Sequence, residues 1–469
     1  MTPRSSKSHT GAAARAAAFP IDTLAPAFIL ALLLSSASAA RAAFLVETAE
    51  PTGGPPSLTL DSQDKPHVAY SDAGASAGYS RRSGGNWIKE TASTRDAGSI
   101  ALDVDALDAP RIAFTEVQTE NLYYAAKSGG IWTVEQVDVA IARDVSIAID
   151  AQGNPHISYA WLLANGQAEL RRARKNGGSW VINTVDVSSF GIGYTSIAID
   201  TQDRPHISYL RESVGGSDYV GHAYRTASNW AVENADVGGI NSVNWTSITT
   251  DAQDNAHLSY NADGKVNYAN KSGGVWTDED MFNATSTGTS IALDATGKPH
   301  ITLGWLGDLY YARKTGGTWV VELADGSAGG GYNSSLELDA AGVPRVSYLN
   351  PSTNAVMYGL RSAATGVADA AAPSAGRLIL RAQPNVVTSG DATVHFQIPA
   401  AAGALDLAVF DLAGRRVTTL ATGATATGAG VAVWDGRDDA GRAVASGTYF
   451  LRLVAGSRMS ATERLVLVR

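Results

Sequence analysis

Short runs of alternating apolar and polar residues follow one another along most of the chain, separated by clusters of Gly, Pro, Asp and Asn. Such runs are typical of β-strands joined by tight turns. One pair of runs, Ser-Ile-Ala-Ile-Asp, a short turn and Pro-His-Ile-Ser-Tyr, recurs seven times. In this alignment the copies begin at Ser57, Ser99, Ser146, Ser196, Ser247, Ser290 and Ser335, at intervals of 42, 47, 50, 51, 43 and 45 residues. The intervals fit a four-stranded blade, so the pattern predicts an all-β fold with a seven-bladed β-propeller.

Each repeat unit contains four predicted strands. In the third unit they cover residues 146–150, 156–159, 169–174 and 180–185. The turn between the first two contains Asp, Gly and Pro, which cap amides, adopt positive φ and begin a strand without a donor. A tryptophan opens the fourth strand in six units, at Trp87, Trp132, Trp180, Trp230, Trp276 and Trp319. We interpret these tryptophans as wedges between neighbouring blades.

The two ends of the repeat region predict how the ring closes. The seventh unit runs through Leu338, Val346 and Tyr358 and then gives way to Ala-rich sequence without a fourth strand. Residues 44–48, ahead of the first unit, match residues 132–136 closely. We therefore expect residues 44–48 to supply the missing strand of the seventh blade, which removes the open sheet edges of the array.

The N-terminus predicts export. Arg4, Lys7 and Arg15 precede an apolar run at 27–34 and a small-x-small cleavage site, which is the organisation of a signal peptide covering residues 1–42. The apolar run is too short to span a bilayer, so we expect no transmembrane segment in the mature chain. The expected location is extracellular or on the outer cell surface.

Composition excludes some classes of partner and site. The 469 residues are 45% hydrophobic with 48 Gly and no Cys, which suits a turn-rich all-β protein without disulfides or thiolate metal sites. Removal of residues 1–42, which contain four Lys or Arg and one Asp, takes the net charge from −9 to −12. An acidic surface argues against a nucleic-acid partner. We expect a monomer with no cofactor and no bound metal.

The C-terminal part differs in composition from the repeats. Residues 43–362 form the predicted propeller, and the Ala-rich residues 363–376, with Pro373 and Ser374, are a predicted linker. Residues 377–469 alternate as about seven short strands, a size suited to one immunoglobulin-like β-sandwich.

Ordered motifs in this last part carry a resemblance. They are Val409-Phe410-Asp411-Leu-Ala-Gly414-Arg415, Val433-Trp434-Asp435-Gly436-Arg437-Asp438-Asp-Ala-Gly441, Ser446-Gly447-Thr448-Tyr449-Phe450 and the closing Leu465-Val-Leu-Val-Arg469. The segment resembles the Ig-like domain of flagellar hook-capping proteins and is similar to the C-terminal sorting domains of type IX secretion cargo. The resemblance implies export and surface attachment through secretion or anchoring machinery, and no chemistry.

The repeats resemble the sialidase-type or BNR repeats, in which a Ser-x-Asp-x-Gly-x-x-Trp turn lies between the third and fourth strands. The corresponding turn, Ser128-Gly-Gly-Ile-Trp132, is shorter and lacks the Asp. The resemblance implies that Ser-Ile-Ala-Ile-Asp is the innermost strand and the Trp strand the outermost.

The predicted strand order separates two faces of the ring. The first-to-second and third-to-fourth turns share one face, called here the turn face, and are short and nearly identical. The remaining loops share the other face, the mouth face, and vary in length and composition, so we expect the ligand there. Three aromatics, Tyr194, Trp245 and Tyr332, precede innermost strands, and Trp161 and Trp305 follow second strands.

The predicted ligand-binding residues are Tyr194, Trp245, Tyr332, Trp161, Trp305, Arg143, Arg211 and Glu212, with Asp308 and Asn333 nearby. Aromatic rings can stack on sugar rings while charged groups bind hydroxyls, so the set favours a glycan. Packing of loops against one another is the alternative for each aromatic. No residue is assigned a catalytic role.

Five histidines share one repeat position: His67, His156, His206, His257 and His300, with Arg111 and Arg345 in the other two units. A ring of metal ligands is one interpretation. A local hydrogen bond to the turn Asp six residues earlier is the favoured one. Turns such as Asp61-Ser-Gln-Asp64 have fewer ligands than a calcium loop, so capping is expected.

The sequence therefore favours a secreted or cell-surface binding protein without enzymatic activity, whose propeller binds a glycan or a surface protein. The alternative is an extracellular glycoside hydrolase or lyase of the sialidase-like type. A sialidase would need three arginines around a carboxylate, and Arg111 and Arg345 fall on the turn face. A retaining glycosidase would need carboxylates about 5 Å apart, which sequence cannot establish.

Overall fold

The computed structural model describes residues 44–467 except 73–75, 140, 214–217, 237–242, 284–285, 327–330, 362–378, 384–385, 388–391, 399–403, 424–427 and 457–458. The predicted signal peptide (1–42) and linker (363–376) lie outside the described residues. The described residues form strands and turns without an α-helix, and hence without a helix long and apolar enough to cross a membrane.

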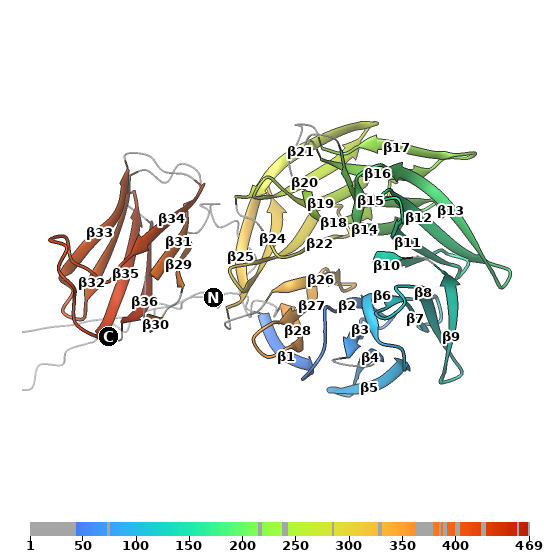
Figure 1. Cartoon of the computed structure of the whole chain (residues 1–469), viewed down its shortest axis with the longest axis horizontal. Helices are drawn as coiled ribbons and strands as arrows, with labels where there is room; N and C mark the ends of the chain where they lie inside the picture. The colour runs from blue at the N-terminus through green and yellow to red at the C-terminus, as the bar shows by residue number, and fades with distance from the viewer. Residues whose placement is uncertain are drawn as a thin grey trace, which may run out of the picture. The chain divides into compact units, whose positions relative to one another are not determined.

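Within the described chain, seven four-stranded antiparallel sheets form the blades of a propeller (Figure 1). Blades 1 to 4 comprise β2 (Ser57–Leu60), β3 (Pro66–Asp72), β4 (Ser76–Ser83), β5 (Asn86–Ser93); β6 (Ala97–Val104), β7 (Pro110–Glu116), β8 (Leu122–Ser128), β9 (Ile131–Asp138); β10 (Ala142–Ile149), β11 (Pro155–Leu162), β12 (Ala168–Asn176), β13 (Ser179–Ser188); and β14 (Gly191–Ile199), β15 (Pro205–Glu212), β16 (Tyr219–Arg225), β17 (Trp230–Asn234).

Blades 5 to 7 comprise β18 (Val243–Thr250), β19 (Ala256–Ala262), β20 (Lys265–Ser272), β21 (Val275–Phe282); β22 (Thr289–Leu293), β23 (Pro299–Trp305), β24 (Asp308–Thr315), β25 (Thr318–Asp325); and β26 (Tyr332–Leu338), β27 (Pro344–Asn350), β28 (Ala355–Arg361), β1 (Phe44–Glu50). The fold class predicted from the repeat is confirmed.

The ring closes through the displaced strand. β1 pairs antiparallel with β28, with Phe44 opposite Arg361 and Glu47 opposite Tyr358, so the predicted completion of the seventh blade is confirmed. Figure 1 shows the blue β1 beside the orange β28. Across the closing contact the Trp87 indole donates to Glu47 at 3.0 Å, so the strand also holds blade 1.

Serine hydroxyls link successive innermost strands. The Oγ of Ser57, Ser146, Ser196, Ser247, Ser290 and Ser335 each accepts the N–H of an apolar residue in the following blade, over 3.0 to 3.2 Å. The last of these bonds, from the Leu58 N–H to Ser335, joins the two ends of the repeat region. Sequence-distant units are thereby held in one closed ring.

The structure corrects the alignment of the second repeat. Ala101 pairs with Ala113 as Ser57 pairs with Ala69, so the innermost strand of blade 2 is two residues out of step with the predicted copy at Ser99. Asp105, not Asp103, accepts the turn amides at 2.9 and 3.0 Å. The string Ser-Ile-Ala-Leu-Asp is a chance match in the wrong register, and Asp103 is free for another role.

The repeated tryptophans lie between blades, as predicted. Their rings meet, edge to face, the third-strand aromatic of the preceding blade, at centroid distances of 5.2 to 5.4 Å for Trp87, Trp132, Trp180, Trp276 and Trp319. Such pairs stabilise beyond the area that they bury. The wedges therefore fix the spacing of the blades.

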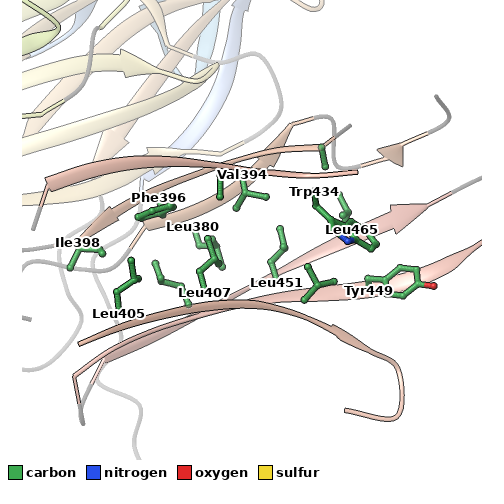
Figure 2. Close-up of a cluster of buried hydrophobic side chains, with 14 of the residues drawn as sticks. Leu380, Val394, Phe396, Ile398, Leu405, Leu407, Trp434, Tyr449, Leu451 and Leu465 are labelled. Carbon is green, nitrogen blue, oxygen red and sulfur yellow. The ribbon is translucent and has the colours of Figure 1, made fainter. Parts of the chain in front are cut away.

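The C-terminal part is a separate two-sheet sandwich. One sheet contains β29 (Ile379–Gln383), β31 (Ala392–Ile398) and β34 (Gly428–Trp434), and the other contains β30 (Val386–Val387), β36 (Met459–Leu467), β35 (Gly447–Ala455), β32 (Leu405–Asp411) and β33 (Arg416–Gly423). Alternate residues such as Phe396, Leu407 and Leu451 fill the space between the sheets (Figure 2). Trp434 is 2% exposed and lies against Tyr449.

Candidate functional site

The mouth face is marked by strained bulges at the start of innermost strands. Asp144, Tyr194, Trp245 and Asn333 have φ of 52°, 51°, 60° and 47°. Each stands two residues before the repeat serine, where the ladder shifts register. Positive φ is an outlier for a bulky side chain and costs on the order of 1 kcal/mol or more.

Hydrogen bonds between neighbouring blades hold these bulges. The Tyr194 amide donates to Asp144 Oδ2 at 2.9 Å, and the Thr195 hydroxyl donates to the Asp144 carbonyl at 2.7 Å. One blade further, the Thr246 hydroxyl donates to the Tyr194 carbonyl at 2.6 Å. The three blades are therefore locked so that successive bulge side chains stand next to one another.

The bulges bring two predicted aromatics into contact. The rings of Tyr194 and Trp245 lie with centroids 5.0 Å apart at 46°, and both side chains are half-buried. Burial, and after it the charges of Asp144 and Glu212, raises the pKa of the Tyr194 hydroxyl. Burial also raises the pKa of Asp144, against the Tyr194 amide and the Arg143 guanidinium.

We call Arg143, Asp144, Tyr194, Glu212 and Trp245 the mouth cluster. It combines two adjacent rings with carboxylates and a guanidinium. Arg143 is 59% exposed and pairs with Glu120 at 2.9 Å. Such a set can stack on an apolar sugar face and bind its hydroxyls.

Other predicted site residues lie around this cluster with partners of their own. The Arg211 guanidinium lies 3.2 Å from Asp186, donates to the Val187 carbonyl at 2.9 Å and contacts Tyr219. Glu212 lies over Gly191, where an added Cβ would come within 2.5 Å of its carboxylate. Arg211 therefore links β15 to residues of β13 and β16, whereas Glu212 is exposed.

The predicted equivalence of Tyr332 with Tyr194 and Trp245 is wrong by one residue. Tyr332 stands three residues before Ser335, and Asn333 occupies the bulge position instead. The Tyr332 side chain is 37% exposed. It belongs to the mouth face of blade 7 but does not share the strained position of the other two.

Trp161 and Trp305 are packing residues in this structure. Trp305 is 6% exposed, lies against Phe282 with centroids 5.3 Å apart, and offers little ring surface to a ligand. Trp161 is half-buried, and the Arg171 guanidinium lies 3.3 Å from its ring centroid. Both lie within their second strands rather than beyond them. Asp308, also predicted nearby, is 6% exposed.

The turn face is filled by a repeated polar network. His67, His156, His206 and His257 hydrogen-bond the turn Asp six residues earlier at 3.2 to 3.4 Å, and His300 lies 3.8 Å from Asp294. The favoured Asp–His interpretation is therefore confirmed for four of these histidines. Burial lowers the pKa of all five, for His156 and His206 to about 4.

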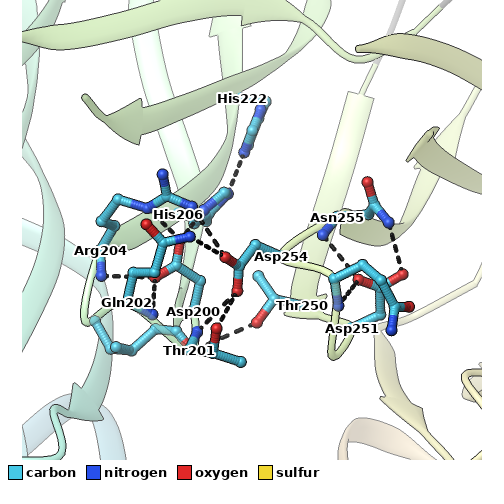
Figure 3. Close-up of polar contacts among 12 residues, drawn as sticks. Asp200, Thr201, Gln202, Arg204, His206, His222, Thr250, Asp251, Asp254 and Asn255 are labelled. Atoms are coloured by element: carbon cyan, nitrogen blue, oxygen red, sulfur yellow. Dashed lines mark hydrogen bonds and ion pairs between the residues drawn. The ribbon is translucent and has the colours of Figure 1, made fainter. Parts of the chain in front are cut away.

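Successive turns are also joined to one another. Asp254 accepts the Thr201 amide at 3.0 Å and the Gln202 side chain, while His206 lies between Asp200 and His222 (Figure 3). The carboxylates of these turns cap amides of their own turns, as predicted. They also cap amides of neighbouring turns, which was not predicted. Among the described residues, no group of three His, Asp or Glu side chains is placed to hold a metal ion.

Sequence reasoning missed an acidic pair on the innermost strands. Asp103 and Glu337 occupy the position of Thr59, Ala148 and Ala198. Burial raises the pKa of Asp103 to about 6, and burial with the charge of Asp103 raises the pKa of Glu337 to about 8. Because blade 1 lies between them, both must lie near the axis of the ring. Correct register in blade 2 would have revealed the pair.

Comparisons with known proteins identify part of the chain and the fold. The FlgD Ig-like domain family matches residues 383–458. No curated protein matches the chain. The propeller is similar in fold to a PL25 ulvan lyase solved with -[GlcA(1-4)Rha3S]-, with a TM-score of 0.51, 12% identity and coverage of 67% of this chain and 95% of that chain.

Two further solved structures match at comparable identity. A fungal AA5-family alcohol oxidase in complex with copper has a TM-score of 0.50 and 12% identity over 91% of this chain and 100% of that chain. The fucose-specific lectin from Aleuria aurantia has a TM-score of 0.43 and 14% identity over 61% and 98%. At these identities the likeness concerns the fold alone.

Proposed function

We propose that this protein is a secreted, cell-surface binding protein whose propeller takes a glycan at the mouth cluster. The observation that carries the proposal is the adjacent pair Tyr194 and Trp245, both held at positive φ. A structural role would be served at lower cost by glycine, which adopts this backbone without strain. Strain that persists at a face with exposed charged groups is characteristic of binding sites.

The test is a glycan array probed with the mature chain, followed by titration of the best ligand. Trp245→Ala should weaken binding by roughly fivefold, since a stacked ring contributes on the order of 1 kcal/mol. Leu107→Ala is the matched control, because Leu107 is an apolar side chain on the turn face with 87% exposure. If Trp245→Ala keeps full affinity, the glycan does not bind at the mouth cluster.

An extracellular glycoside hydrolase or lyase is the second candidate, and Asp144 is the observation that favours it. A carboxyl group with a raised pKa beside a half-buried tyrosine suits general acid or base chemistry. Incubation of array hits with the protein would reveal cleavage products or an unsaturated product. If the protein cleaves a glycan and Asp144→Asn abolishes this cleavage, the hydrolase or lyase replaces the binding proposal. If the protein binds a glycan without cleaving it, the binding proposal is supported.

We further propose that residues 377–469 direct export and surface attachment, as in type IX cargo, after removal of residues 1–42. The match of residues 383–458 to the FlgD Ig-like domain supports this assignment. The proposal also includes a relation of the propeller repeats to the sialidase-type repeats. Deletion of 377–469 should leave the chain inaccessible to protease added to intact cells of the native host, and full accessibility would contradict the proposal.

A further inference from the structure

A glutamate of the fourth strand clasps the next blade at six of the seven contacts between described blades. The carboxylates of Glu47, Glu90, Glu135, Glu233, Glu279 and Glu322 bind Arg82, Lys127, Lys175, Lys271, Lys314 and Arg361 of the following blade. Four of these carboxylates also accept a Trp indole at 2.9 to 3.0 Å. A carboxylate that binds a cation of the next blade is thus common to six of the seven contacts, and at four of them it also accepts an indole N–H.

The contact between blades 3 and 4 lacks this carboxylate. Asn183 occupies the glutamate position, since it pairs with Arg172 as Glu90 pairs with Tyr79. Blade 4 nevertheless presents the usual partners, Arg225 and Trp230, which pair with each other across β16 and β17. A cation and an indole therefore face a neutral amide.

The same contact carries an additional cation. Arg172 stands where five other blades have a tyrosine, and its Nη atoms reach His156 Nδ1 at 3.0 Å and Asn183 Oδ1 at 3.4 Å. Its Nε is buried without a hydrogen-bond partner among the described residues. Burial, and after it the charges of Arg174 and Arg225, lowers the pKa of Arg172 to about 10.

No nearby carboxylate neutralises the charges of Arg172 and Arg225. The Asp150 carboxylate is already paired with the Arg174 guanidinium at 2.8 Å and with His156 Nε2 at 3.2 Å. No described carboxylate is within ion-pair distance of Arg172 or Arg225. Asn183 is exposed and Trp230 is half-buried, so the position left by the missing glutamate is open to solvent.

We propose that the contact between blades 3 and 4 binds the carboxylate of a uronic acid residue. The carboxylate takes the place that glutamate has at the other contacts, between Arg172 and Arg225. The sugar ring lies against Trp230, whose half-exposed indole suits a pyranose face. Guanidinium groups bind carboxylates with strong, charge-assisted hydrogen bonds. This site is separate from the mouth cluster and does not rest on the proposed function.

The test is calorimetric titration of the mature chain with glucuronate, with glucose and acetate as comparison ligands. Glucuronate should bind and weaken with added salt, whereas glucose should not bind. Asn183→Glu should abolish glucuronate binding, because the new carboxylate would itself occupy the site. It should also raise the melting temperature, because the ion pair found at the other contacts between blades would be restored. Asn183→Gln, similar in size but neutral, should keep binding, as should Trp245→Ala.

Two further measurements keep the proposal open to contradiction. Arg225→Gln should reduce glucuronate affinity on the order of tenfold without lowering the melting temperature. Absence of glucuronate binding at millimolar concentration would overturn the proposal, as would undiminished binding by Asn183→Glu. Acetate binding as tightly as glucuronate would overturn the assignment to a sugar, because Trp230 would then contribute nothing.

Discussion

The two faces of the propeller use the same repeat in opposite ways. On the turn face, hydrogen bonds from His to Asp, and between successive turns, repeat round the ring, so each unit completes its neighbour. On the mouth face, equivalent bulge positions hold Asp144, Tyr194, Trp245 and Asn333, four different residues at positive φ. Repetition maintains the fold, and departures from the repeat are where binding chemistry can be added.

The largest expected effect is on closure, the feature on which both faces depend. Deleting residues 44–50 removes the outer strand of blade 7 and the Glu47 partner of Trp87. The melting temperature should fall by at least about 10 °C, because a sheet edge and its apolar face become exposed. Calorimetry measures it, with Glu47→Gln as the milder control. Unchanged melting would disprove the split blade.

Low pH should destabilise the fold through the histidines of the turn face. The folded pKa of His156 and of His206 is lowered from 6.5 to about 4, so the unfolded chain binds protons first as pH falls. Stability should decline from about pH 6.5 to pH 4, by on the order of 1 kcal/mol per pH unit for each histidine. Denaturant titration across this range checks the slope, and His206→Gln should flatten it. A stability maximum near pH 4 would contradict the buried, neutral histidines.

The axis of the ring should respond to pH in the opposite direction. The pKa of Glu337 is raised from 4.5 to about 8, so the unfolded chain loses this proton first as pH rises. The contribution of Glu337 to stability is present below pH 4.5 and is lost toward pH 8. Glu337→Gln should therefore stabilise the propeller at pH 8 by on the order of 1 kcal/mol or more and have little effect at pH 4. Glu120→Gln, on the surface, is the control, and equal effects of the two variants would refute the assignment.

Architecture was predictable because its signals are redundant, and the site was not because its signals are single residues. Closure of the ring was predicted from one missing strand and one displaced strand. The position of the tryptophans between blades was predicted from six copies of the same motif. A slip of two residues at Ser99 concealed Asp103, and a slip of one placed Tyr332 with Tyr194. Trp305 has the same sequence position as Trp161, and only packing against Phe282 shows that it is buried.

The smallest expected effect isolates backbone strain at the mouth face. Trp245→Ala and Trp245→Gly both lose the ring, but only glycine relieves a φ of 60°. The glycine variant should therefore be more stable than the alanine variant by roughly 0.5–1 kcal/mol. Val134, in a fourth strand and 40% exposed, supplies the matched pair, and there alanine should be the more stable. Denaturant midpoints of the four variants decide the matter. If glycine is also the less stable residue at position 245, the bulge carries no strain, and strain no longer supports a binding role for Trp245.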